Sequence, residues 1–122
     1  MSSVASLVLI FLGGGLGSIS RFGIGKLSLN FYDGKFPLGT LITNTLACTI
    51  LGITLFILKD KLTGIEWIKY FVVIGFCGGF STFSAFGLET VKLIQDGLLA
   101  YAIANILVSL TVGIGILFIL VK

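Results

Sequence analysis

The chain has 122 residues, of which 57% are hydrophobic and 11% are charged, and its formal net charge is +3. A soluble domain usually carries about 25% charged residues, so this composition indicates an integral membrane protein. The small net charge gives no reason to expect a nucleic-acid partner, and the lack of histidine excludes metal catalysis through imidazole.

The hydropathy pattern predicts four membrane-spanning helices. Each apolar stretch approaches or exceeds the ~20 residues that a helix needs to cross the hydrocarbon core. Strand alternation is absent, which argues against a β-barrel. We therefore expect an all-α membrane protein with a single transmembrane domain over residues 1–122, because four spans leave no room for a soluble domain. The expected spans cover residues 4–24, 37–58, 66–94 and 98–121.

The first span lacks a basic n-region and is not followed by an A-x-A cleavage site, so we expect a retained helix rather than a signal peptide. Its four glycines, Gly13, Gly14, Gly15 and Gly17, favour close packing against another helix. Arg21 follows them near the end of the span. Its side chain could snorkel to the membrane interface, or it could place positive charge at the mouth of an anion path.

The second span begins after a loop over residues 26–37, in which Asp33-Gly34 indicates a turn. Pro37 stands where a helix would start, a position that tolerates its missing N–H. Asn44 is the most informative residue of this span, because an amide in hydrocarbon must face protein or water. It could bond to another helix, or it could direct its NH₂ donors at a passing anion.

The third span contains a glycine-, hydroxyl- and phenylalanine-rich stretch at residues 75–86. Gly78-Gly79 is unfavourable inside a helix, so we expect a break near residues 78–81. In lipid, such a break is tolerated only where it is buried in protein or lines a wet cavity, and its freed carbonyls could bind a cation. Phe83 and Phe86 share one helix face, and they could simply pack a helix interface.

Polar residues in and after the third span have several possible roles. Glu89 could pair with Lys92 or be solvated near the membrane edge. In the fourth span, Tyr101, Asn105 and Ser109 are spaced to share one face. The two cysteines, Cys48 and Cys77, lie inside apolar stretches without a partner motif, so neither a disulfide nor a metal site is expected.

The basic residues show no bias between the two sides of the membrane. With four spans, the termini and the second loop share one side, and the first and third loops share the other. The first side holds Lys59, Lys61, Lys69 and Lys122, and the second holds Arg21, Lys26, Lys35 and Lys92. Because basic residues normally set orientation, equal counts predict insertion in both orientations, which could then pair as an antiparallel dimer.

Three motifs together resemble the Fluc (CrcB) family of fluoride channels. The resemblance covers all four spans in order; it is specific in the third span and only general in the fourth. The residues that carry it are Gly13, Gly14, Gly17 and Arg21 in the first span; Pro37, Gly39, Thr40, Leu41 and Asn44 in the second; and Gly75, Cys77, Gly78, Gly79, Ser81, Thr82, Phe83, Ser84, Phe86 and Glu89 in the third.

The resemblance implies a fluoride-selective channel that exports fluoride passively across the bacterial cytoplasmic membrane and so relieves fluoride toxicity. It also implies a homodimer of antiparallel subunits, surrounded by membrane lipid, with two pores and a central sodium ion. The sodium-binding backbone carbonyls match Gly78 and Ser81. The pore residues match Asn44, Phe83, Ser84 and Phe86, and the vestibule arginine matches Arg21.

The chain departs from the family pattern at Ala85 and Gly87, where relatives often carry hydroxyl residues. These departures remove two hydroxyls from the polar track that the family pattern implies. The balanced charge count argues against a paired heterodimer of oppositely biased chains.

Two other classes fit part of the pattern. Small multidrug-resistance exporters also have four spans and dual topology, but proton coupling needs a carboxylate in the first span, and this chain has none there. A small structural subunit of a membrane complex would need neither the glycine-rich break nor Asn44. An enzyme is not expected, because no nucleophile–base set is present.

Overall fold

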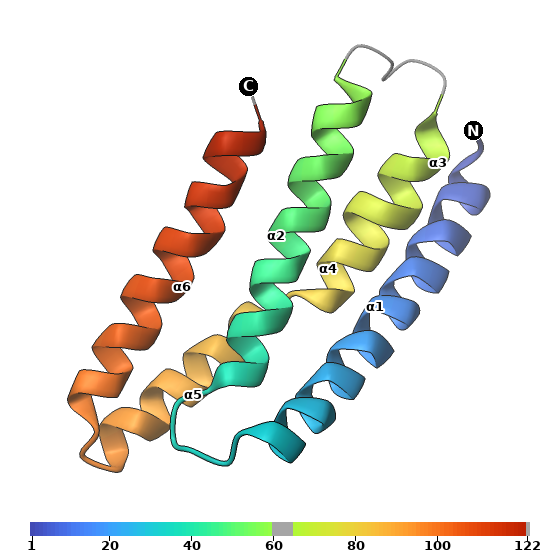
Figure 1. Ribbon diagram of the computed structural model, residues 1–122. Helices are drawn as coiled ribbons and strands as arrows, with labels where there is room; N and C mark the ends of the chain where they lie inside the picture. Colours follow the sequence, from blue (N-terminus) through green and yellow to red (C-terminus); the bar gives the residue numbers. More distant parts are fainter. Residues whose placement is uncertain (60–64, 122) are drawn as a thin grey trace.

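The computed structural model describes residues 1–59 and 65–121, and over these residues its regular structure is entirely helical. Four helical segments are long and apolar enough to cross a membrane: Ser3–Phe31, Leu38–Leu58, Glu66–Gln95 and Leu99–Leu120. Both termini lie at one end of the bundle (Figure 1). The second segment ends, and the third begins, at this same end. The expected class, an all-α membrane protein with four spans, is confirmed. Lys61 and Lys122, which enter the charge count, lie outside the described residues.

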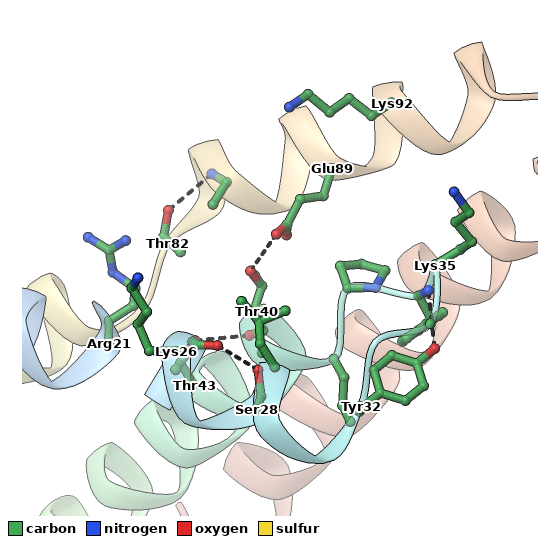
Figure 2. A pocket seen from close by; sticks show the side chains of 18 of the residues that line it. Arg21, Lys26, Ser28, Tyr32, Lys35, Thr40, Thr43, Thr82, Glu89 and Lys92 are labelled. Carbon is green, nitrogen blue, oxygen red and sulfur yellow. Dashed lines mark hydrogen bonds between the residues drawn. The ribbon is translucent and has the colours of Figure 1, made fainter. Parts of the chain in front are cut away.

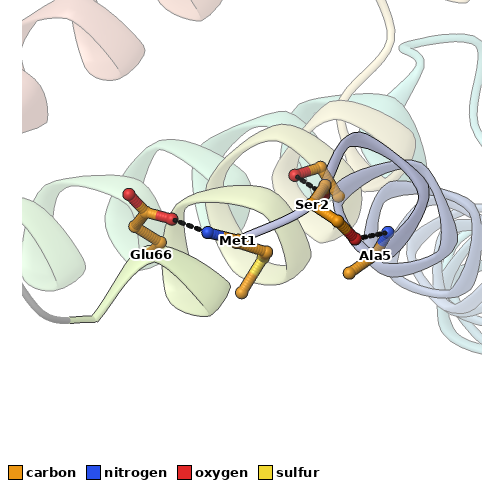
Figure 3. A network of polar contacts seen from close by, with 5 residues as sticks. Met1, Ser2, Ala5 and Glu66 are labelled. Carbon is orange, nitrogen blue, oxygen red and sulfur yellow. Dashed lines mark hydrogen bonds and ion pairs between the residues drawn. The ribbon is translucent and has the colours of Figure 1, made fainter.

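Helix α1 (Ser3–Phe31) begins with a side-chain cap, because Ser2 Oγ accepts a hydrogen bond from the N–H of Ala5 at 3.1 Å. Next to this cap, the Met1 amine lies 3.3 Å from the carboxylate of Glu66, the first residue of α3 (Figure 3). The helix continues past residue 24, so part of the expected 26–37 loop is helical. No proline or turn motif interrupts the chain before Asp33-Gly34, and the helical hydrogen bonds continue to that point.

Helix α2 (Leu38–Leu58) starts directly after Pro37, and α6 (Leu99–Leu120) packs along it. Small residues allow this approach: a Cβ on Gly52 would lie 2.7 Å from the Leu120 side chain, and one on Gly113 would lie 3.3 Å from Cys48 Sγ. The turn into α6 contains Gly97 with φ of 78°, a conformation that strongly favours glycine.

The third span consists of four helical pieces rather than one helix. These are α3 (Glu66–Ile68), a π-helix η1 (Lys69–Cys77), α4 (Gly78–Phe80) and α5 (Phe83–Gln95). The π-helix was not expected, since helices of this type are rare and usually a single turn. Between α4 and α5, Ser81 and Thr82 are extended, and α5 leaves in a new direction (Figure 1).

The glycine pair does not itself form the break. Gly78 and Gly79 belong to α4, and Gly78 has helical angles of φ −64° and ψ −39°. Gly79 instead allows close packing, because a Cβ there would overlap the carbonyl oxygen of Gly14. Gly13 similarly meets the backbone of η1 near Gly75. The glycines of α1 therefore hold the first half of the third span at backbone contact distance, as the small-residue pattern predicts.

Candidate ion pathway

The break in the third span is held by Asn44 from the first half of α2. Its Oδ1 accepts a hydrogen bond from the N–H of Thr82 at 2.7 Å, and its Nδ2 donates to the carbonyl oxygen of Thr82 at 3.2 Å. One side-chain amide thus satisfies both backbone groups of an extended residue in a membrane helix. Asn44 therefore makes the interhelical bond that was one of its two possible roles. A second Nδ2–H remains beyond the one given to Thr82.

Thr82 also starts the next helix. Its Oγ1 accepts a hydrogen bond from the N–H of Ala85 at 3.1 Å, which is the usual N-cap arrangement. This role was not expected from the sequence, although a threonine directly before an apolar helix is an N-cap signal. Ser84 Oγ lies 3.2 Å from Thr82 Oγ1, so one of these two hydroxyls donates a hydrogen bond to the other beside the break.

Arg21 lies inside α1 and reaches the other side of the break. Its Nε donates a hydrogen bond to the carbonyl oxygen of Gly79 at 3.1 Å. A guanidinium at the carbonyl end of a helix segment stabilises groups that have no helical donor. Arg21 is thus attached to the break by one nitrogen, while its side chain also lines the cavity described below.

Phe83 and Phe86 lie together on the first turn of α5. Their ring centroids are 5.9 Å apart and their planes are tilted by 41°. Phe83 is 82% exposed, so this pair does not fill the core of the subunit. By contrast, Phe80 is buried and stacks on Phe76. The structure therefore places Phe80 in the core and leaves Phe83 outside it, while Phe86 is half-buried.

A cavity of about 630 Å³ opens from the break toward the α1–α2 and α5–α6 turns (Figure 2). Thr82, at the break, and Ala85, in the first turn of α5, are among its lining residues. Its lining includes the cationic side chains of Arg21, Lys26, Lys35 and Lys92 and the carboxylates of Glu89 and Asp96. Four cations against two carboxylates leave this cavity with an excess of positive charge, which favours anions.

Inside the cavity, Glu89 on α5 faces α2. Its Oε2 accepts a hydrogen bond from Thr40 Oγ1 at 3.0 Å (Figure 2). Its Oε1 is buried and has no hydrogen-bond partner among the residues that the structure describes. Glu89 is therefore attached to α2 and lines the cavity. Sequence analysis missed the Thr40 contact, since the two residues are 49 positions apart.

The break also frees the two backbone carbonyls expected to bind sodium. In a continuous helix, the carbonyl oxygens of Gly78 and Ser81 would accept from the N–H groups of Thr82 and Ala85. Those N–H groups instead donate to the side chains of Asn44 and Thr82. Within residues 1–59 and 65–121, neither carbonyl receives a backbone hydrogen bond. Freed main-chain oxygens are the ligands that broken membrane helices offer to sodium, so these residues fit such a site.

The polar residues of α6 separate into two groups. Asn105 is buried and donates to Thr90 Oγ1 on α5 at 3.0 Å, and Ser109 donates to Asn105 Oδ1 at 3.3 Å. Tyr101, one turn earlier, is exposed and instead meets Phe36 edge-on, with centroids 6.4 Å apart. The expected shared face is thus continuous only from Asn105 to Ser109.

Comparison with known proteins covers nearly the whole chain. Residues 8–121 match the family model described as "CrcB-like protein, Camphor Resistance (CrcB)". A protein of Serratia proteamaculans (strain 568), named "Fluoride-specific ion channel FluC", is 42% identical over 109 residues, which are 88% of this chain and 84% of that protein. Proteins of the same name from Pyrococcus horikoshii (40% over 113 residues, 92% and 89%) and Coxiella burnetii (strain CbuK_Q154; 37% over 110 residues, 89% and 89%) are also similar.

The family match, the identity to these relatives and the four apolar helices agree on one assignment. The matched residues include the broken third span and the motifs of the first and second spans. The chain is a multi-pass membrane protein that belongs to the CrcB family.

Proposed function

We propose that the chain is a fluoride-selective channel that lets fluoride leave the cell passively across the plasma membrane. The observation that carries this proposal is the Phe83–Phe86 pair beside a helix break, in which Phe83 is exposed and Phe86 is half-buried. The edge of an aromatic ring carries the positive end of its quadrupole, so ring edges can face a small anion without binding it as tightly as a full charge would. The names of the relatives support the same substrate.

The other proposed pore groups surround this pair. The second Nδ2–H of Asn44 and the hydroxyl of Ser84 are donors that replace part of the hydration shell of fluoride. Arg21 and the lysines of the cavity supply positive charge on the approach to the break. The hydrogen bond from Arg21 Nε to the carbonyl oxygen of Gly79 fixes the guanidinium beside the break.

The functional unit is proposed to be an antiparallel homodimer in lipid. A phenylalanine that is 82% exposed in one subunit becomes a pore residue when a second copy covers it. Gly78 supports this arrangement, because a Cβ at that position would meet no atom of its own subunit within 4 Å. The glycine is therefore not required by packing within the subunit. The balanced charge count supports the two orientations that such a dimer needs.

A sodium ion at the dimer centre is proposed to bind the carbonyl oxygens of Gly78 and Ser81. When bound, the ion would coordinate carbonyl oxygens that otherwise lack hydrogen-bond donors in the membrane interior. The contribution of this chain is to keep those oxygens free: Asn44 and Thr82 accept the N–H groups that would have bonded to them.

The experiment is fluoride efflux from liposomes that contain the purified protein, followed with a fluoride electrode. Efflux should begin when a potassium ionophore sets the membrane voltage, and a pH gradient alone should not drive it, because the first, second and fourth spans contain no carboxylate to carry protons. Loading the same liposomes with chloride is the selectivity control. Obligatory movement of protons with fluoride, or no fluoride efflux from the assembled protein, would contradict the channel proposal.

A further inference from the structure

A series of hydrogen bonds, buried at its centre, connects α6 to the turn of α5 that carries Phe86. Ser109 Oγ donates to Asn105 Oδ1 at 3.3 Å, Asn105 Nδ2 donates to Thr90 Oγ1 at 3.0 Å, and Thr90 Oγ1 donates to the carbonyl oxygen of Phe86 at 2.8 Å. Asn105 is only 2% exposed, and with Thr43 it is one of the two largest fully buried side chains among the described residues.

The direction of these bonds is determined. The hydroxyl of Thr90 has one proton, and the Phe86 carbonyl takes it, so Thr90 can only accept from Asn105. The amide of Asn105 must therefore present its NH₂ to Thr90 and its oxygen to Ser109. In a low-dielectric interior, bonds at both ends of the Asn105 amide favour this arrangement, because a flipped amide would leave Thr90 and Ser109 facing the wrong groups.

The location of these hydrogen bonds matters because α5 is not continuous with the helix before it. The extended residues Ser81 and Thr82 leave α5 free to rotate unless side contacts prevent it. Two polar contacts attach it to α2, at Thr82 and at Glu89. The Asn105–Thr90 bond attaches it to a second helix, α6.

We propose that Asn105 is a positioning residue that sets the rotation of α5 and hence the placement of the Phe86 ring in the ion path. Side chains lie about 6 Å from a helix axis, so a rotation of about 10° moves a ring by about 1 Å. That displacement is large compared with the tolerance of about 0.5 Å of a preorganised site. The proposal rests on the proposed function for its effect on fluoride flux, but the position of the ring can be measured without flux.

The test combines two measurements on reconstituted full-length protein. The first is fluoride efflux per assembled protein. The second is the ¹⁹F NMR spectrum of 4-fluorophenylalanine incorporated at position 86, which reports the environment of the ring whether or not the protein conducts. The main variant is Asn105→Leu, which has a similar size, removes the bond to Thr90 and leaves the Thr90 hydroxyl bonded to Phe86.

In Asn105→Leu, we expect efflux per assembled protein to fall about tenfold or more and the ¹⁹F resonance to shift or broaden. Thr90→Ser keeps the hydroxyl and should behave as the wild type. Tyr101→Phe, on the exposed side of the same helix, is the matched control and should change neither measurement. The double variant Thr90→Val/Asn105→Leu replaces the polar pair with apolar groups; it should assemble well and still show low efflux and an altered resonance.

An unchanged ¹⁹F resonance with wild-type efflux in Asn105→Leu would overturn the proposal. If Asn105→Leu fails to assemble, the double variant decides: wild-type efflux and resonance would show that Asn105 and Thr90 serve only burial. If the wild-type protein carries no fluoride, the channel proposal fails, and the ¹⁹F measurement alone still decides whether Asn105 positions the ring.

Discussion

Replacing Asn44 with leucine removes the side chain that holds the break open. The N–H and the carbonyl of Thr82 then lose bonds of 2.7 and 3.2 Å. A typical hydrogen bond contributes about 1 kcal/mol, and leaving a buried partner unsatisfied costs about 1–3 kcal/mol, whereas bonds measured inside membranes average about 0.6 kcal/mol. Between these limits, we expect Asn44→Leu to lower the free energy of unfolding by about 1–4 kcal/mol.

Asn44→Asp separates the structural role of this residue from its role toward the anion. The carboxylate can still accept from the Thr82 N–H, so the variant should retain more stability than the leucine variant. However, it places negative charge on the proposed anion path, and it has no N–H to offer. We therefore expect Asn44→Asp to abolish fluoride flux while the dimer persists, and Asn44→Leu to lose both flux and stability.

Both variants are compared with Thr54→Val, which removes a 2.7 Å hydrogen bond within the same helix, from Thr54 to the carbonyl oxygen of Ile50, and does not involve the break. Efflux per protein is measured with the fluoride electrode, and stability is measured from the fraction of dimer that remains after heating, by size-exclusion chromatography. Wild-type flux in a stable Asn44→Asp dimer would refute the reasoning, because it would remove Asn44 from the ion path.

Three further predictions follow from the same geometry. Phe83→Ile and Phe86→Ile should each reduce flux per assembled dimer, because isoleucine keeps the apolar character but lacks a ring edge; a loss of dimer yield at unchanged flux per dimer would instead indicate packing. Gly79→Ala should destabilise the subunit by about 1–3 kcal/mol in thermal unfolding, since its Cβ would overlap the backbone of Gly14. Gly78→Ala should instead leave the subunit folded and weaken only dimerisation. Equal unfolding temperatures for the two variants would argue against this assignment. Two lysines added between α2 and α3 should bias insertion and lower activity, which C-terminal reporter fusions and efflux assays can measure; a single orientation in the wild-type chain would contradict dual topology.

The sequence alone determined the fold class and the number of spans, because lipid imposes a length and a composition on every helix that crosses it. It also located the stretch in which the third span breaks, because glycine and hydroxyl residues in the middle of an apolar span conflict with a continuous helix. Small residues in α1 predicted close helix packing, and Gly13 and Gly79 do meet backbone across that contact. Each of these inferences depends on residues that are near one another along the chain.

Only the tertiary structure decided where the helix breaks and how its groups are satisfied. Local propensity favoured Gly78-Gly79, but the extended residues are Ser81 and Thr82, because Asn44, 38 positions away, binds both backbone groups of Thr82. The π-helix of the third span, the bond from Arg21 to the Gly79 carbonyl and the Asn105–Thr90 contact were likewise not predicted. In a medium without water, each polar group must find a partner within the protein, and which partner it finds depends on how the helices pack rather than on its neighbours in sequence.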